Sequence, residues 1–241
     1  MTKSELSFAV LVLSGAVVQA AAVTPAPALE SIVAHVASAL TENRSHLRAY
    51  QVTRNYKLFG KERQKTKSEV NADITFLPPG VDQYLIHKVE GLGLGEVIVR
   101  KILENESELL ADPSASEISM ANYNFRLIRE AMLKGRPCYV LAIQPLRKDV
   151  RLLRGLIWVD ANSYLIHRVE GEPAKTPSWW VHDIHIVLDF QDVDGMWLQT
   201  SLVSTANVRL LGQHTMVAHD VEYRLSGLEA GIIKVVSPGD E

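Results

Sequence analysis

The chain has 241 residues, 47% of them hydrophobic, which is enough for one large domain with a core of its own. Its 25 Lys and Arg against 28 Asp and Glu give a formal net charge of −3, which excludes the strong basic excess typical of nucleic-acid binders. The single cysteine, Cys138, excludes an intrachain disulfide and lies far from any position where a lipid could be attached near the N-terminus.

The first residues have the pattern of an export signal. Lys3 precedes an apolar run over residues 6–18 that ends in alanines, where a signal peptidase could cut. The run is short for a membrane span, although Glu5 weakens the charged start and leaves an uncleaved anchor as the alternative. We therefore expect a periplasmic protein with a signal peptide at 1–22 and an extended Pro/Ala linker at 23–28.

Two segments predict amphipathic helices. Apolar residues recur at steps of three and four over residues 29–47, which gives the first helix. Asp112-Pro113 ends the second, because proline cannot continue a helix. The stretch 91–95 before it is glycine-rich and fits neither nucleotide-binding fingerprint, so we interpret it as a lid hinge. The pattern of the second helix comprises Val97, Ile98, Ile102, Leu103, Glu106 and Leu110.

The rest of the chain predicts β-strands. Alternating residues over 50–58, with Arg54 among the apolar set, and over 70–76 predict a hairpin, and residues 84–90 predict a third strand. Short turns separate the later strands, which therefore pair as antiparallel neighbours in a meander that curves toward a barrel. These later strands are predicted at residues 122–132, 138–144, 152–160, 164–170, 181–191, 196–207, 208–212 and 215–225.

One octapeptide occurs twice. Residues 84–91 read YLIHKVEG, and residues 164–171 read YLIHRVEG. A repeat architecture would show the same spacing several times, so we interpret the pair as two strands with equivalent roles in one sheet. Strict alternation would place Tyr, Ile, Lys or Arg and Glu on one face, and Leu, His and Val on the other.

The candidate chemical motifs favour ordinary structural roles. His182 and His185 are three residues apart, which on a strand places them on opposite faces and excludes a shared metal ion. Asp192 and Asp194 precede a glycine and predict a hairpin turn rather than a calcium loop. Cys138 lies in an apolar strand and is interpreted as a buried hydrophobic residue. We assign no catalytic residue, metal or cofactor, because no Ser-His-Asp or paired-carboxylate pattern fits these strands.

Four stretches, at residues 135–141, 155–160, 167–175 and 177–180, resemble secreted bacterial proteins described as outer-membrane lipoprotein-sorting-like. These are similar to the superfamily of the periplasmic lipoprotein carrier LolA, its outer-membrane receptor and a stress sensor with the same fold. The resemblance implies an α+β, mainly β, open antiparallel half-barrel of about eleven strands with a helical lid. It also implies an inward arginine that latches the lid in the carrier; no motif assigns that role here, and Arg54 is a candidate.

We expect a single half-barrel domain at residues 29–226, followed by a C-terminal tail at 227–241. A curved sheet that does not close leaves an apolar concavity, which suits lipid or lipoprotein acyl chains bound without covalent chemistry, as in lipoprotein sorting. The alternatives are an envelope-stress sensor or scaffold module, and a hydrolase with an unrecognised site.

The expected partners are acyl chains, an envelope protein and, transiently, a membrane, with no nucleic acid. The pair Trp179-Trp180 is expected to be exposed at the mouth of the barrel, where it could touch a membrane or a lipid. The candidate ligand-binding residues are Tyr56, Ile74, Phe76, Leu85, Trp158, Ile166, Trp179, Trp180 and Trp197.

Overall fold

The computed structural model describes residues 27–61, 65–78, 80–91, 94–226 and 233–236. Helices α1 (Leu29–His46) and α2 (Leu94–Ala111) confirm the two predicted helices, and a short 3-10 helix, η1 (Pro113–Ala115), follows α2. None of the helices in these ranges is both long enough and apolar enough to cross a membrane. The predicted signal peptide lies outside the described residues.

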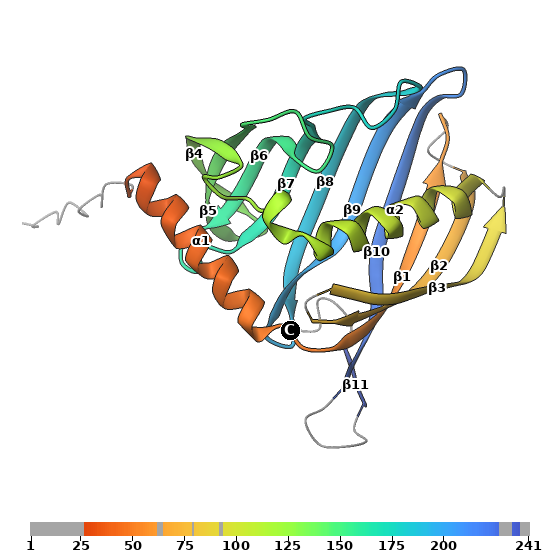
Figure 1. Ribbon diagram of the computed structural model, residues 1–241, viewed down its shortest axis with the longest axis horizontal. Coiled ribbons are helices and arrows are strands. Elements are labelled where there is room, and N and C mark those ends of the chain that lie inside the picture. The colour runs from red at the N-terminus through yellow and green to blue at the C-terminus, as the bar shows by residue number, and fades with distance from the viewer. Residues whose placement is uncertain (1–26, 62–64, 79, 92–93, 227–232, 237–241) are drawn as a thin grey trace, which may run out of the picture.

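The described chain forms one antiparallel sheet of eleven strands. Its order is β3-β2-β1-β10-β9-β8-β7-β6-β5-β4, with β11 paired to β10, so that the first and last long strands are neighbours while β3 and β4 stay apart as edges (Figure 1). The predicted open half-barrel, mainly β, is confirmed. The strands are β1 (Tyr50–Phe59), β2 (Thr66–Leu77), β3 (Gly80–Gly91), β4 (Tyr123–Leu133), β5 (Arg136–Pro145), β6 (Leu153–Asp160), β7 (Ile166–Pro173), β8 (Val181–Val193), β9 (Met196–Val208), β10 (Gly212–Ser226) and β11 (Ile233–Val236).

One predicted strand, at residues 208–212, is wrong. Val208 is the last residue of β9 and Gly212 the first of β10, and Leu211 N–H donates to the Val208 carbonyl at 3.0 Å to close the turn between them. Apolar composition favoured a strand, but the two flanking strands pair directly and leave only a hairpin connection. Strand β11 lies in the segment that the sequence analysis assigned to a tail.

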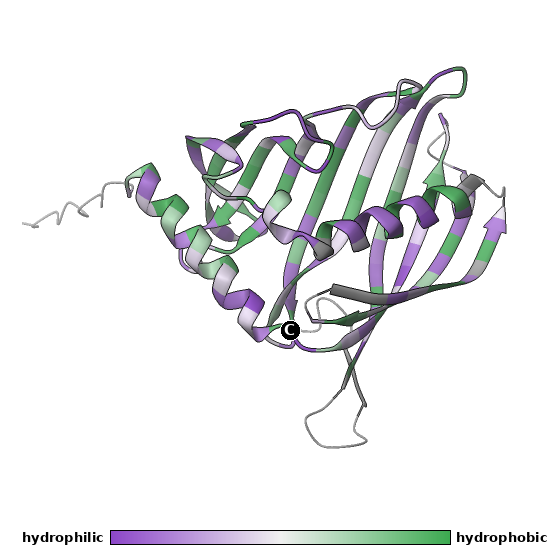
Figure 2. Ribbon diagram, viewed as in Figure 1, coloured by the Kyte–Doolittle hydropathy of each residue, from purple (hydrophilic) through white to green (hydrophobic). Residues whose placement is uncertain are grey.

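A continuous row of side chains crosses the sheet on the face that carries both helices. Residues directly opposite each other in antiparallel strands share a face, so the register defines this row. Figure 1 shows α1 and α2 on this one side of the sheet, and Figure 2 shows the apolar residues that alternate along the strands. The row consists of Leu127, Leu141, Ile157, Val169, Leu188, Leu202, Ala218, Tyr56, Val70 and Val89.

Each helix covers a different half of this face. Helix α1 buries Ile32, Val33 and Val36 against β4 to β7, whereas α2 lies against β1, β2 and β3 and shares one buried cluster with β9 and β10. The C-terminal end of α1 is fixed to β9, because the Asn43 side chain accepts from Trp197 N–H at 2.8 Å and donates to the Trp197 carbonyl at 2.9 Å. This pair of hydrogen bonds mimics a strand pairing and anchors α1 to the sheet.

The repeated octapeptide does not alternate strictly, and that prediction is wrong. The register skips His87 in β3 and His167 in β7, so each copy carries a bulge at the same histidine. A bulge shifts the alternation by one residue, and Ile166 and Val169 therefore both face the helices and are buried. The two copies share this local geometry although β3 lies at an edge and β7 inside the sheet.

Candidate functional site: a buried arginine under helix α2

Helix α2 closes over the apolar face of the sheet through one stripe of side chains. Val99 and Leu103 are buried in one cluster with side chains of β1, β2, β9 and β10, and Ile98 and Ile102 pack against its margin. Full burial of such a side chain stabilises the closed arrangement by about 1.5–3 kcal/mol. The stripe follows the i, i+3 and i+4 spacing that the sequence predicts.

Arg54 lies in the middle of this contact. Its position in β1, between buried Val52 and Tyr56, places the side chain on the helix-covered face, where it is only 9% exposed. A shift in the β1–β10 register brings Asp220 directly opposite Arg54. Arg54 Nε donates to Asp220 Oδ1, and Nη2 donates to Oδ2 at 3.3 Å. The Tyr223 hydroxyl donates to the same carboxylate, so Arg54 has an acceptor that belongs to the sheet.

The remaining side of the guanidinium is used by helix α2. Arg54 Nη1 donates to Glu106 Oε1 at 2.9 Å and to Oε2 at 3.0 Å. Glu106 lies on the apolar stripe of α2, one turn beyond Leu103, which brings its carboxylate onto the sheet face. The Glu106 side chain is 28% exposed, so this bond lies at the margin of the buried contact.

The two neighbouring carboxylates keep the Arg54 guanidinium positively charged. Burial by itself works against the charge, but Glu106 and Asp220 outweigh it and keep the pKa of Arg54 well above its ordinary value. Burial raises the pKa of the Asp220 carboxyl, and Arg54 opposes that rise. Burial likewise raises the pKa of the Tyr56 hydroxyl, which lacks a hydrogen-bond partner among the described residues.

These contacts divide Arg54 between an acceptor on the sheet and an acceptor on helix α2. If α2 lifts from the sheet, Glu106 leaves with it, while Asp220 and Tyr223 stay on β10. A buried charge that loses its only partner costs several kcal/mol, but here Arg54 keeps Asp220. The arrangement therefore fastens α2 through Glu106 and still allows α2 to be released.

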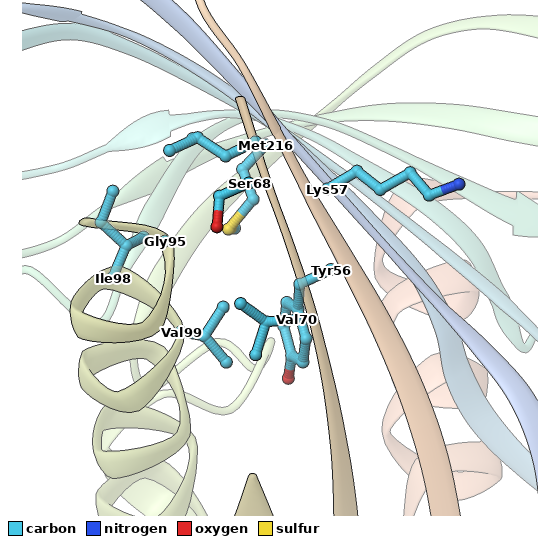
Figure 3. A pocket seen from close by; sticks show the side chains of 9 residues that line it. Tyr56, Lys57, Ser68, Val70, Gly95, Ile98, Val99 and Met216 are labelled. Atoms are coloured by element: carbon cyan, nitrogen blue, oxygen red, sulfur yellow. The ribbon is translucent and has the colours of Figure 1, made fainter. Parts of the chain in front are cut away.

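The described side chains leave little space under the first turns of α2. A cavity of about 10 Å³ remains under its first turns, which is about enough for a single water molecule. Figure 3 shows Val99 of the helix directed toward Val70 and Tyr56 of the sheet. Sites for small organic ligands occupy about 300–1,000 Å³, so an acyl chain enters here only if α2 moves. The cavity is lined by Tyr56, Lys57, Leu58, Ser68, Val70, Gly95, Ile98, Val99 and Met216.

Gly95 allows the first turn of α2 to lie directly on β2. A Cβ atom at this position would fall far inside contact distance of Ser68 Oγ and Cβ. Ser68 is itself buried, and its hydroxyl donates to the Glu90 carbonyl at 3.0 Å, so it has little freedom to give way. The close approach of helix and strand therefore depends on glycine.

We expect Gly95→Ala to push the first turn of α2 away from the sheet. Overpacking of this kind costs about 1–3 kcal/mol of unfolding free energy, and amide hydrogen exchange in α2 should become faster. The companion change Ser68→Gly removes both clashing atoms and should restore most of the protection. Unchanged exchange in the Gly95→Ala helix would contradict this packing.

The structure places four of the predicted ligand-binding residues on the helix-covered face. Tyr56 and Ile74 lie beneath α2, and Ile166 lies beneath α1. Phe76 is buried at the end of β2, where its ring stacks on that of Tyr50 with 5.0 Å between centroids. Ligand contact by these residues stays a prediction.

The other five predicted residues lie elsewhere. Leu85 and Trp158 point to the face of the sheet opposite the helices, because each is the immediate neighbour in sequence of a residue that faces the helices. Trp197 is half-buried and donates its indole N–H to the Ile166 carbonyl at 2.8 Å. Trp179 and Trp180 are exposed in the loop before β8, at the end of the strands where β9 turns into β10, whereas Arg54 pairs with Asp220 inside β10.

The sequence analysis offered Arg54 as a latch candidate but missed its partners. Glu106 was part of the predicted helical stripe, and a charged residue on an apolar stripe was the available signal. Asp220 continues the inward-facing positions of β10 after Met216 and Ala218. A charged residue in an apolar alternation was therefore the available signal here too. Neither residue could be connected to Arg54 before the β1–β10 pairing was known.

The remaining sequence motifs have structural roles. Cys138 is buried as predicted, and burial raises the pKa of its thiol. Asp192 accepts from Gly195 N–H at 3.0 Å in the β8–β9 hairpin, which confirms the predicted turn. His182 bonds to neighbouring Asp183, and His185 lies 3.2 Å from Glu170. A register shift between the two histidines pairs them with Asn207 and Thr205, which share one face of β9, so the prediction of opposite faces is wrong. In the part of the chain that is described, no three His, Cys, Asp or Glu side chains are arranged to hold a metal ion.

No protein-family model matches the chain, and no curated protein matches it. Among solved structures, it is similar to an outer membrane lipoprotein-sorting protein domain from Vibrio parahaemolyticus, with 14% identity, 80% of this chain and 93% of that chain covered, and a TM-score of 0.42. Solved structures described as lipoprotein-sorting or LolA superfamily proteins are thus among those that the chain resembles.

Two further structures belong to the same group of matches. A LolA superfamily protein from Nitrosomonas europaea has 10% identity, with 87% of this chain and 98% of that chain covered and a TM-score of 0.39. A structure described as the MucA/MucB complex of Pseudomonas aeruginosa has 11% identity, with 78% and 93% covered and a TM-score of 0.28.

Proposed function

We propose that this protein binds the acyl chains of a lipid or lipoprotein, without covalent chemistry, between helix α2 and the sheet after α2 has lifted. The observation that carries the proposal is the division of Arg54 between Glu106 on the helix and Asp220 on β10. Such a contact holds the closed form and leaves no uncompensated charge in the open form.

The face beneath α2 has the chemistry that an acyl chain requires. Apolar side chains surround the Arg54–Asp220 pair on this face, and transfer of apolar surface out of water is worth about 25 cal/mol per Å². In the closed form, α2 supplies that burial through Val99 and Leu103. An acyl chain would take the place of these side chains, so the ligand competes with the protein's own helix.

The test is direct. The purified chain should carry lipid detectable by native mass spectrometry or organic extraction, and after delipidation it should bind a fluorescent fatty-acid probe saturably at one site. If no lipid co-purifies and the probe does not bind, the proposal is wrong. We also propose that the protein is periplasmic. Recovery of the chain in an osmotic-shock fraction would support this location. The mass of the recovered chain defines its N-terminus and therefore shows whether the signal has been cleaved.

A second candidate is a scaffold or stress-sensing module that recognises an envelope protein. The observation that favours it is the small cavity, about 10 Å³, under the first turns of α2, where the helix packs directly on the sheet as it would in a fold without an internal ligand. In that case a pull-down from envelope extract should recover one defined partner. The partner should bind equally well to delipidated protein, which separates this candidate from lipid carriage.

A further inference from the structure

An exposed apolar tip lies at one end of the strands, where two loops come together. The loop before β8 contributes Trp179 and Trp180, 78% and 48% exposed, and the β9–β10 hairpin contributes Leu210, which is fully exposed, and Leu211, 58% exposed. Figure 1 shows both connections at the same end of the strands. We call these four residues and Arg209 the tip cluster.

The tip cluster is held together by specific contacts. Arg209 N–H donates to the Trp180 carbonyl at 2.8 Å, which extends the β8–β9 pairing by one rung into the loops. The Arg209 guanidinium carbon lies 5.3 Å from the centroid of the Trp179 ring, within the range of a cation–π contact. The apolar side chains therefore share one surface with a cation among them.

Leu210 does not serve the stability of the fold. Its φ of +71° lies in the left-handed region, which glycine and asparagine adopt far more readily than leucine. Its side chain is fully exposed, so no burial offsets the backbone strain. An outlier of this kind at an exposed tip indicates a role outside the folded chain.

We propose that the tip cluster inserts into the interfacial region of a lipid bilayer. Tryptophan is enriched at membrane–water interfaces because its ring is apolar with one polar group. Leu210 and Leu211 would enter the acyl region, and Arg209 would extend its guanidinium toward lipid phosphates. Asp183, which lies close to the loop in sequence, is already bonded to His182 and Asn207.

The shape of the tip favours a bilayer over a small ligand. Ligand sites are concave and surround their ligand, whereas a hairpin end with a fully exposed leucine projects outward. The proposal does not depend on acyl binding under α2, because the tip cluster and the Arg54 site lie on different elements. A chain that fails to hold fatty acid could still dock on a membrane.

The experiment uses flotation with vesicles of phosphatidylcholine containing phosphatidylglycerol, on the periplasmic chain with its N-terminus verified by mass. This check matters because an uncleaved apolar segment at residues 6–18 would itself bind vesicles. Wild type should float with the vesicles, and brominated lipid should quench its tryptophan fluorescence. The double variant Trp179→Phe/Trp180→Phe should lose that quenching, because Trp158 and Trp197 lie elsewhere in the sheet.

Leu210→Gly provides the decisive variant, since it removes the side chain and relieves the backbone strain together. Its thermal midpoint should be unchanged or higher, while its vesicle affinity should fall about tenfold or more. Met132→Ser, which removes an exposed apolar side chain from the end of β4, should leave vesicle binding unchanged. Arg209→Gln should weaken binding to anionic vesicles more than to neutral ones.

Three results would overturn the proposal. Wild type could remain in the unbound fraction, Leu210→Gly could bind vesicles as tightly as wild type, or quenching could persist without Trp179 and Trp180. Capture of a protein through the tip cluster, in the absence of vesicle binding, would assign this surface to a protein partner instead.

Discussion

Arg54→Leu should lower the free energy of unfolding by about 3–5 kcal/mol, the usual cost when one member of a buried ion pair is removed. Asp220 is 6% exposed and would stay on β10 with only the Tyr223 hydroxyl as its partner. Urea unfolding followed by tryptophan fluorescence measures the change. The deficit should shrink at mildly acidic pH, because burial raises the pKa of Asp220 and the folded variant would gain a proton there that the unfolded chain binds less tightly.

Two controls separate charge from packing in this experiment. Arg154→Leu removes an arginine from the exposed pair with Glu172 and should change the stability by less than about 0.5 kcal/mol. The double variant Arg54→Leu/Asp220→Leu removes both charges of the sheet-bound pair and should recover a large part of the loss. A double variant no more stable than Arg54→Leu would show that the arginine acts through packing alone.

The fold could be predicted from the sequence to a large extent because its signals are local. Alternation defined most strands, turn residues separated them, and Asp112-Pro113 marked the end of α2. The bulges at His87 and His167 were missed, because a bulge depends on the register with a neighbouring strand. The same holds for the hairpin at residues 209–211, whose leucines favour a strand by composition.

The candidate site could be predicted only in part, because it depends on contacts between distant segments. Arg54 and Asp220 are separated by 166 positions in the chain and meet through the β1–β10 pairing. Glu106 joins them only because α2 crosses that pair of strands. The sequence also predicted an apolar concavity, but no local pattern indicates how far the side chains of α2 fill it.

The two helices differ in how they are fastened to the sheet. Asn43 ties α1 to the backbone of β9 through two hydrogen bonds, whereas Glu106 ties α2 to a side chain that has another acceptor. Release of α1 would leave backbone groups of β9 unpaired, but release of α2 leaves Arg54 bonded to Asp220. If one helix opens to admit a ligand, we expect it to be α2.

Glu106→Ala should tighten the binding of a fatty-acid probe by about tenfold or more, because the ligand competes with the closed helix. A hydrogen bond to a charged group contributes about 1.5–3 kcal/mol, and each 1.4 kcal/mol taken from the closed form raises the population of the open form about tenfold. Titration of delipidated protein with the fluorescent probe measures the dissociation constant, and hydrogen exchange measures the opening of α2.

Glu104→Ala is the matched control for this variant. Glu104 lies on the same helix, and its carboxylate pairs with Lys101 of that helix at 3.3 Å, so its loss should leave the lid closed and the probe affinity unchanged. If Glu106→Ala accelerates exchange in α2 but binds the probe no more tightly than Glu104→Ala, then α2 opens without exposing an acyl site. The Arg54 cluster would in that case fasten a structural helix, and the scaffold function would be the one that fits.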